Sequence, residues 1–381
     1  MTVAGEPYDD VLIEPLRRAS AALPEGTRWT DAHTHTGQDD PDGVTATVDE
    51  LLGALDRAGH ERAVVFTTAE PGGDPPANDR VLAEAEGSGG RLVAFCRVDP
   101  NTDDPAAEAV RCLDRGAAGI KLHPRSDAFV LSHRGVEALA ALADERAVPI
   151  LIHAGRGIPA LGTDALNLAR RFGRANLILA HAGISDIGVI APALGDVPNM
   201  FFDSAWWQVS DLLTLYALVA PSQILYASDI PYGSGRFAAF AFLRCAREVG
   251  LGPEALAAIA GGNVERILAG EDPADLGPAP GMEALSSRWL AGERVIAYTS
   301  TAVMAAFRGA VAMEPLALAR LATQAPLEGT TGADEAAVLA VLDELLAHAQ
   351  AMGEANPDRP RALVFAALAA QIVAGTPRCG V

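Results

Sequence analysis

Short apolar runs alternate with longer segments of helical periodicity along the first two thirds of the chain. Each run is rich in Val, Ile, Leu and Phe, and it is followed by a turn and then by a segment rich in Ala, Leu, Arg and Glu. Near-continuous apolar strands that alternate with helices are typical of a parallel sheet covered by helices on both faces. The pattern therefore predicts a series of βα units.

Eight of these runs are predicted strands, at 29–35, 62–68, 92–98, 119–123, 149–153, 176–181, 200–204 and 224–229. Predicted helices between them span 48–58, 105–115, 135–146, 163–172 and 208–219. Eight βα units within 29–271 match the roughly 250 residues of a closed (β/α)₈ TIM barrel, an α/β fold. The alternative, an open doubly wound sheet, would carry a Gly-rich phosphate loop after its first strand, where this chain has the acidic turn TGQDDPDG.

Two further segments flank the predicted barrel. Residues 1–28 predict an N-terminal helical segment, and residues 272–381 predict a helical C-terminal extension whose clearest periodicity runs from 333 to 352. Its amphipathic segments, among them 361–373, could pack on the outer helices of the barrel, join subunits into a homo-oligomer or cover the barrel mouth. The sequence leaves these three arrangements open.

Charge narrows the range of partners. The chain of 381 residues has 29 Lys and Arg against 49 Asp and Glu, which gives a formal net charge of −20. Such a surface repels phosphate backbones and anionic lipid headgroups, so we expect a small-molecule substrate and neither a nucleic-acid nor a membrane partner. The N-terminus lacks the features of a signal peptide, no clean run of about 20 apolar residues is found, and the four cysteines form no CxxC pair. Together these features predict a cytoplasmic protein.

Metal-ligating side chains lie at the ends of several predicted strands. In a (β/α)₈ barrel the catalytic groups come from the carboxyl ends of the strands, which open on one face. Because side chains alternate in direction along a strand, His33 and His35 of the first strand point to the same side. The residues at these strand ends are His33, His35, Lys121, His153, His181 and Asp229.

These groups form a candidate site for a divalent metal. One such histidine alone is more often a hydrogen-bonded core residue than a ligand. Four histidines and one aspartate at equivalent strand ends instead predict several ligands around one point. With room left for water, that arrangement is typical of a catalytic metal site rather than a structural one.

Lys121 is the only lysine in the chain. A lysine amine can lose its proton on burial or beside another cation, whereas a guanidinium stays charged. Neutral Lys121 could take up carbon dioxide and bridge two metals as a carbamate. As an ammonium it could instead hold a substrate carboxylate or balance Asp229, and the sequence does not decide between the two roles.

Six motifs resemble the amidohydrolase superfamily, in particular its small-barrel branch. That branch includes aminocarboxymuconate semialdehyde decarboxylase and many uncharacterised metal-dependent hydrolases. The motifs are DAHTH (31–35), GIKLHP (119–124), ILIHAG (150–155), LILAHAG (177–183), YASDIP (226–231) and GGNVERIL (261–268). They cover the predicted barrel in the family's order, and the C-terminal extension lies outside the resemblance.

The resemblance also implies roles for individual residues. It assigns the metal to a set of four ligands, His33, His35, His153 and Asp229. His181 then binds a second ion or contacts the hydrolytic water. In binuclear relatives the lysine at the position of Lys121 is the carbamylated bridge between two ions.

The predicted function is that of a metal-dependent hydrolase acting on an amide, ester or lactone-type carbonyl of a small molecule. A divalent ion, most simply Zn²⁺, lowers the pKa of bound water to about 7. Asp229 would transfer the proton, and His181 would stabilise the oxyanion if it is not itself a ligand. Arg125, Arg156 and Trp206 follow strand ends and are candidates for substrate binding.

Two alternatives stay open. The first keeps the metal but makes the reaction a non-oxidative decarboxylation of a small unsaturated or aromatic acid, with His181 as proton donor. The second is a non-catalytic scaffold whose helical tail binds a partner. The full set of candidate ligands argues against the scaffold, because an inert barrel has no physical need for them.

Overall fold

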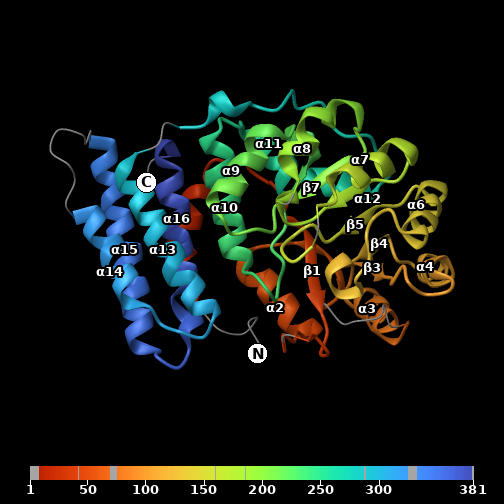
Figure 1. Ribbon diagram of the computed structural model, residues 1–381, viewed down its shortest axis with the longest axis horizontal. Helices are drawn as coiled ribbons and strands as arrows, with labels where there is room; N and C mark the ends of the chain where they lie inside the picture. The colour runs from red at the N-terminus through yellow and green to blue at the C-terminus, as the bar shows by residue number, and fades with distance from the viewer. Residues whose placement is uncertain are drawn as a thin grey trace.

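A computed structural model describes residues 8–41, 43–68, 75–158, 160–184, 186–286, 289–324 and 333–379. Eight parallel strands follow one another in sequence order around a single sheet (Figure 1). The chain just after the eighth strand pairs with the first: Asp229 N donates to His33 O at 2.9 Å and His35 N donates to Ile230 O at 2.8 Å. These bonds close the sheet, and the predicted TIM barrel is confirmed.

The strands are short and buried. They are β1 (Thr30–Thr36), β2 (Arg62–Thr67), β3 (Leu92–Arg97), β4 (Gly119–Leu122), β5 (Ile150–Ile152), β6 (Leu177–Leu179), β7 (Met200–Asp203) and β8 (Ile224–Leu225). Their inner and outer faces both pack on apolar side chains, as expected for a parallel sheet enclosed by helices.

Several predicted strands extend too far at their carboxyl ends. The last residues of 149–153, 176–181 and 224–229 lie outside the sheet, and His181 begins a short 3₁₀ turn (His181–Gly183). His181 and Asp229 adopt φ of 57° and 60°, in the left-handed region that no strand can contain. The correction matters for the site, because it places these side chains on loops that bend over the barrel mouth.

Helices surround the barrel. The main ones are α2 (Val48–Ala58), α3 (Pro75–Gly87), α4 (Pro105–Asp114), α6 (Arg134–Arg146), α7 (Gly162–Arg171), α9 (Val209–Leu218) and α10 (Gly235–Glu248). Five of them, α2, α4, α6, α7 and α9, lie within a residue of their predicted positions. The start of α2 shows the local cause: Thr47 and Glu50 form a reciprocal capping box. At the N-terminal end of the chain, α1 (Ile13–Ser20) packs against α10.

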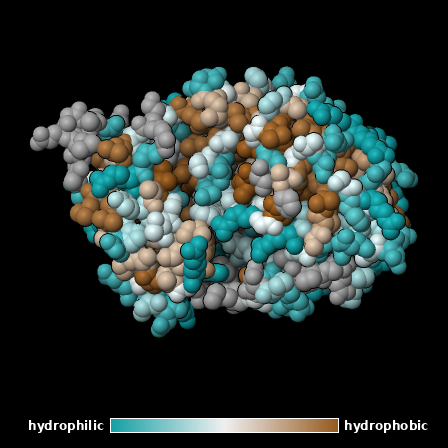
Figure 2. Space-filling view, viewed as in Figure 1, coloured by the Kyte–Doolittle hydropathy of each residue, from teal (hydrophilic) through white to brown (hydrophobic). Residues whose placement is uncertain are grey.

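Four helices of the C-terminal extension form a bundle beside the barrel, drawn in blue in Figure 1. They are α13 (Leu290–Phe307), α14 (Met313–Gln324), α15 (Ala333–Ala355) and α16 (Val364–Gly375). The last of them packs against α9 and α10 of the barrel. Figure 2 shows hydrophobic side chains gathered on this face of the molecule, where the bundle borders the barrel.

One bundle helix has the length and composition of a membrane span. Residues 335–355 of α15 have a mean hydropathy of 1.2 and are 39% buried. This segment contains Glu335, Asp343, Glu344 and Glu354, so it is not a clean run of about 20 apolar residues of the kind that the sequence predicts to be absent. In the fold this helix packs between α14 and α16, and a helix enclosed in a bundle is apolar for the same reason as a membrane span.

Candidate metal centre

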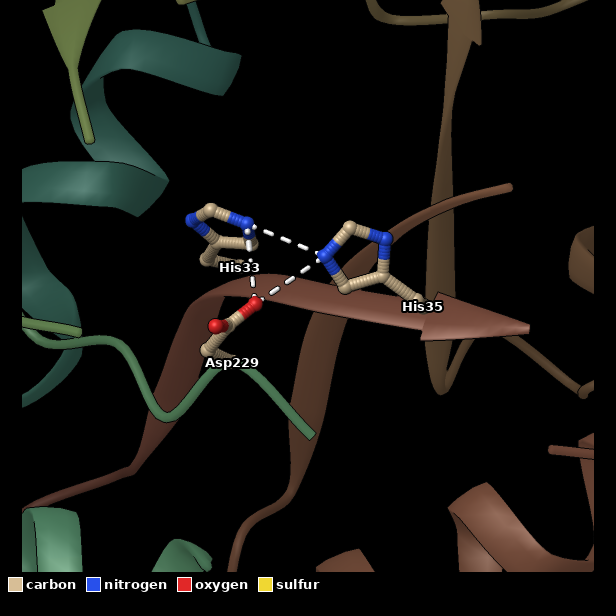
Figure 3. A group of neighbouring side chains, drawn as sticks. All are labelled: His33, His35 and Asp229. Atoms are coloured by element: carbon tan, nitrogen blue, oxygen red, sulfur yellow. Dashed lines mark hydrogen bonds and ion pairs between the residues drawn. The ribbon is translucent and has the colours of Figure 1, made fainter. Parts of the chain in front are cut away.

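Three side chains meet at the carboxyl end of the barrel (Figure 3). His33 and His35 come from β1, and Asp229 comes from the loop after β8, the neighbouring strand of the closed sheet. The two Nε2 atoms lie 3.1 Å apart. Asp229 Oδ1 lies 3.3 Å from His33 Nε2 and 3.1 Å from His35 Nε2.

In both histidines the hydrogen-bond partner of Nδ1 determines which ring nitrogen carries the proton. His35 Nδ1 lies 2.9 Å from the backbone oxygen of Thr67, which can only accept, so this nitrogen is the donor. His33 Nδ1 lies 2.7 Å from Oδ2 of the buried Asp203 carboxylate and donates in the same way. Both Nε2 atoms therefore present lone pairs towards each other and towards Asp229.

This donor set fits a divalent cation. Three lone-pair atoms in mutual contact repel unless a positive charge lies among them. Ligands bound about 2.1 Å from Zn²⁺ in tetrahedral geometry lie about 3.4 Å apart, close to the spacings found here. Histidine ligands also commonly donate their second ring nitrogen to a carboxylate or carbonyl, as His33 and His35 do.

The other two predicted histidines continue the cluster on its far side. His181 Nε2 lies 3.0 Å from His153 Nδ1, and the ring of His181 lies 5.1 Å from that of His33. His181 Nδ1 donates to the backbone oxygen of Ala205 at 2.8 Å, so its Nε2 also faces the cavity with a lone pair when the ring is neutral. His153 and His181 thus lie next to the group of three without belonging to it.

Burial keeps several of these rings neutral. Desolvation, followed by the charge of Lys121, lowers the pKa of His35 to about 3 and that of His33 well below its usual value. Desolvation and the neighbouring His181 lower the pKa of His153 in the same direction. Neutral imidazole is the form that binds metal ions.

Burial also shifts the pKa values of the two oppositely charged side chains, Asp229 and Lys121, towards neutral pH. Desolvation raises the pKa of Asp229 to about 7, although His181 and Lys121 oppose the shift. Desolvation lowers the pKa of Lys121 to about 7, against the pull of Asp203 and Asp229. The Lys121 amine is fully enclosed, contacts the ring of Phe66 at 4.5 Å and has no hydrogen-bond partner within the described part of the chain.

Sequence reasoning missed three residues of the site. Asp203 holds His33, His123 stacks on His153 with ring centroids 4.2 Å apart, and Tyr232 packs edge-on against His35 at 5.0 Å. Asp203 lies one residue before the end of the predicted strand 200–204 and ends β7 in the structure, so the rule that found the other ligands would have found it too. His123 ends the predicted strand 119–123 and lies in the motif GIKLHP, so the same rule would have found it as well. Tyr232 lies beyond the predicted strand 224–229, and no sequence pattern marks it.

A cavity of about 1180 Å³ opens over the cluster. The predicted substrate residues Arg125, Arg156 and Trp206 all line it. Trp206 is held by a hydrogen bond of 2.7 Å from its Nε1 to Asp211, and its ring lies 6.1 Å from that of His181. Arg156 lies over the ring of Trp207, with 5.8 Å between its guanidinium carbon and the ring centroid.

The part of the chain that matches a known protein family coincides with the barrel. The family model described as Amidohydrolase matches residues 30–269. The chain belongs to the amidohydrolase family. This amidohydrolase is therefore related to enzymes, and members of the family's superfamily bind divalent metals, with which the cluster of His33, His35 and Asp229 is compatible.

Solved structures resemble this amidohydrolase in fold at low sequence identity. One is a candidate amidohydrolase from Staphylococcus aureus, with 16% identity, a TM-score of 0.53 and coverage of 64% of this chain and 99% of that one. Another is 2,6-dihydroxybenzoate decarboxylase from Rhizobium, with 16% identity, a TM-score of 0.51 and the same coverage. No curated protein matches the sequence. The 64% of this chain that these structures cover equals the barrel in length. Since 99% of each of the other chains is already used in the match, neither has a segment left that could correspond to the helical tail.

Proposed function

We propose that this amidohydrolase is a metal-dependent hydrolase of a small molecule with an amide, ester or lactone-type carbonyl. The observation that carries the proposal is the group of three lone-pair atoms from His33, His35 and Asp229 at the floor of a large cavity. Zn²⁺ is the ion we expect, since its usual ligands are imidazole nitrogens and carboxylate oxygens. Such an ion supplies Lewis acidity to a carbonyl and lowers the pKa of water.

Asp229 is the proposed proton carrier. Its carboxyl lines the cavity, and its Oδ1 lies 3.3 Å from His33 Nε2 and 3.1 Å from His35 Nε2, so it would lie beside both the ion and a water molecule bound to that ion. A carboxylate within hydrogen-bond reach of that water can accept its proton. Asp229 would therefore take a proton from the attacking water and deliver it to the leaving group.

His181 receives a narrower role than the sequence alone allowed. Because its Nδ1 donates to Ala205 O, the neutral ring can only accept at Nε2. An acceptor suits an ion or the hydrogen of a water molecule, and it does not suit an oxyanion. We therefore assign His181 to ion or water binding, together with His153.

Lys121 is proposed as the site of a carbamate in the hydrolase. A carbamate forms only on a neutral amine, and burial lowers the pKa of Lys121 to about 7. The amine lacks a hydrogen-bond partner in the part of the chain that the structure describes, and it is near enough to Asp203 and Asp229 for their charges to act on it. A carbamate on Lys121 would add an anionic oxygen ligand for a second ion.

A second candidate is metal-dependent decarboxylation. The group His33, His35 and Asp229 provides ligands for one ion, and a single ion that holds a carboxylic acid suffices for this reaction. The fold shared with 2,6-dihydroxybenzoate decarboxylase is compatible with it. Here a protonated His181 would supply the proton that replaces carbon dioxide, so the two candidates need His181 in different protonation states.

Metal content per chain tests the shared part of both candidates. We expect bound metal in the purified protein and its loss in His35→Ala. The variant His348→Gln, in α15 of the bundle, is the matched control and should keep the metal. Equal metal content in wild type and His35→Ala would overturn the proposed centre.

The number of ions and the products separate the two reactions. Two ions per chain, one lost in His153→Ala, together with an intact mass raised by one labile carbon dioxide, support the hydrolase. Because Lys121 is the only lysine, no other lysine side chain can carry that adduct. One ion per chain and release of carbon dioxide from an aromatic acid support the decarboxylase instead.

A further inference from the structure

The C-terminal bundle supplies one wall of the cavity over the metal centre. The end of α13, the segment 358–362 and the start of α16 all line it, alongside the loops of the barrel. The family match ends at residue 269, so this wall is an addition of this chain to the family barrel. Because the cavity exceeds the roughly 300 to 1000 Å³ of common ligand pockets, it has room for more than the reacting group.

An aromatic wall leads from the metal centre to the bundle. Successive ring centroids lie 6.1 Å apart from His181 to Trp206, 5.6 Å from Trp206 to Trp207 and 5.9 Å from Trp207 to Phe307. The first three residues belong to the barrel, and Phe307 ends α13 of the bundle. All four line the cavity, and successive rings are tilted by 61°, 33° and 67°, so the wall offers both faces and edges to an aromatic ligand.

Two guanidinium groups flank the outer end of this wall. Arg156, on the barrel loop after β5, lies over Trp207, and Arg361, in the segment before α16, lies over Phe307 at 5.9 Å. We call these four side chains, Arg156, Trp207, Phe307 and Arg361, the bridge. They join barrel and bundle across the cavity, since the rings of Trp207 and Phe307 touch.

The arginines of the bridge lack anionic partners. Across the described ranges neither guanidinium forms an ion pair or a side-chain hydrogen bond, although the chain carries 49 acidic residues. Of the carboxylates that line the outer cavity, Asp40 accepts from the hydroxyl of Tyr232 at 2.5 Å, and Asp358 pairs with neither arginine. Two unpaired guanidiniums beside an edge-to-face aromatic pair match a carboxylate that is attached to an apolar ring.

We propose that the bridge is a specificity site for a carboxylate at the far end of an extended aromatic substrate whose other end lies at the metal centre. Arg361 and Arg156 bind the distal carboxylate, and Trp207 and Phe307 pack against the adjoining ring. The proposal rests on the proposed function for the position of the reacting end. It adds a substrate class, an elongated aromatic acid, and a specificity residue, Arg361, that the bundle contributes.

Binding of a matched pair of probes tests the bridge without turnover. The probes are biphenyl-4,4′-dicarboxylate and 4′-acetylbiphenyl-4-carboxylate, which keeps one carboxylate and replaces the other with a neutral methyl ketone of similar shape that cannot be hydrolysed. Dissociation constants are measured by calorimetry on the metal-loaded full chain. A charge-assisted hydrogen bond predicts that wild type binds the dicarboxylate at least about tenfold more tightly than the methyl ketone.

Variants then locate this preference. Arg361→Gln and Arg156→Gln should each reduce the preference to about threefold or less, because each removes one of the two cations. Arg308→Gln changes an exposed arginine of the same helical tail that does not line the cavity, and it should keep the full preference. Equal preference in wild type and Arg361→Gln, or no preference in wild type, would overturn the proposal. Loss of the proposed function would appear separately, as unchanged metal content in His35→Ala.

Discussion

The carboxylate of Asp203 fixes the ring of His33 from behind, with Oδ2 2.7 Å from His33 Nδ1. Its other oxygen accepts from the backbone nitrogens of His181 at 2.9 Å and Ala205 at 3.1 Å, so one carboxylate orients both halves of the histidine cluster. Burial raises the pKa of Asp203, but these hydrogen bonds and the charges of His181 and Lys121 oppose the shift.

Asp203→Asn should therefore weaken metal binding. The amide keeps the shape and one acceptor oxygen, but it loses the charge that holds the Nδ1 proton of His33. Removing such a partner typically costs 10- to 100-fold in metal affinity. Titration with Zn²⁺ measures the effect, and Asp211→Asn, which alters only the hydrogen bond to Trp206, serves as control. Unchanged affinity in Asp203→Asn would contradict the orienting role.

Gly155 leaves room for two of the histidine rings. A Cβ at this position would lie 2.7 Å from Cδ2 of His181 and 3.1 Å from Cε1 of His153, so Gly155→Ala must move both rings. We expect activity to fall by about tenfold or more, because small displacements of catalytic groups are costly. Gly173→Ala, where nothing lies within 4 Å, should behave as wild type. Equal kcat/KM in the two variants would show that the cluster tolerates the shift.

Lys121 should make the stability of the metal-free protein depend on pH. Its pKa is lowered to about 7 in the fold, whereas an exposed lysine has a pKa of about 10.4. Between these two values the unfolded chain binds one more proton than the folded chain, so the free energy of unfolding rises with pH. Lys121→Met should remove this rise.

Chemical denaturation of both proteins, freed of metal with a chelator, from pH 7 to pH 10 measures the difference. We expect wild type to gain stability relative to Lys121→Met across this range. Below pH 7 Lys121 is charged in the folded protein, and burying this charge costs stability. Lys121→Met should therefore be the more stable protein there by a few kcal/mol, the free energy that corresponds to the shift in the pKa of Lys121. Parallel stability profiles would show that Lys121 keeps an ordinary pKa.

The last turn of the bundle is tied to the barrel through a buried arginine. Arg244 of α10 donates from Nε to Oγ1 of Thr376 at 2.8 Å and from Nη2 to the Thr376 backbone oxygen at 2.8 Å. Thr376→Val removes the side-chain acceptor and should lower the free energy of unfolding by about 1–3 kcal/mol. Faster proteolysis of the tail should accompany this loss, since α16 packs on α10.

Thr301→Val makes the same chemical change on the exposed side of α13, where the hydroxyl bonds only its own helix at 3.1 Å. Its unfolding free energy should stay within about 0.5 kcal/mol of wild type. If Thr376→Val were equally mild, the bundle would be held by apolar packing alone.

The sequence by itself determined the barrel and the ends at which its chemistry lies. Apolar runs of strand length between helical segments are compatible with only a few folds. In a barrel all strand ends lie on one face, so histidines at these ends are brought to that face by the fold itself. The sequence could not show that β5, β6 and β8 stop short of His153, His181 and Asp229, because the left-handed backbone of the last two residues depends on the loops around them.

Only the tertiary structure decided which of these side chains form one group and which nitrogen of each ring carries the proton. Those facts depend on partners such as Asp203, Thr67 and Ala205, which are distant in sequence from the rings they hold. It also showed that the helical tail both packs on the barrel and lines the cavity, two of the arrangements that the sequence left open. Helical periodicity marks an apolar face but carries no information on which surface will cover it.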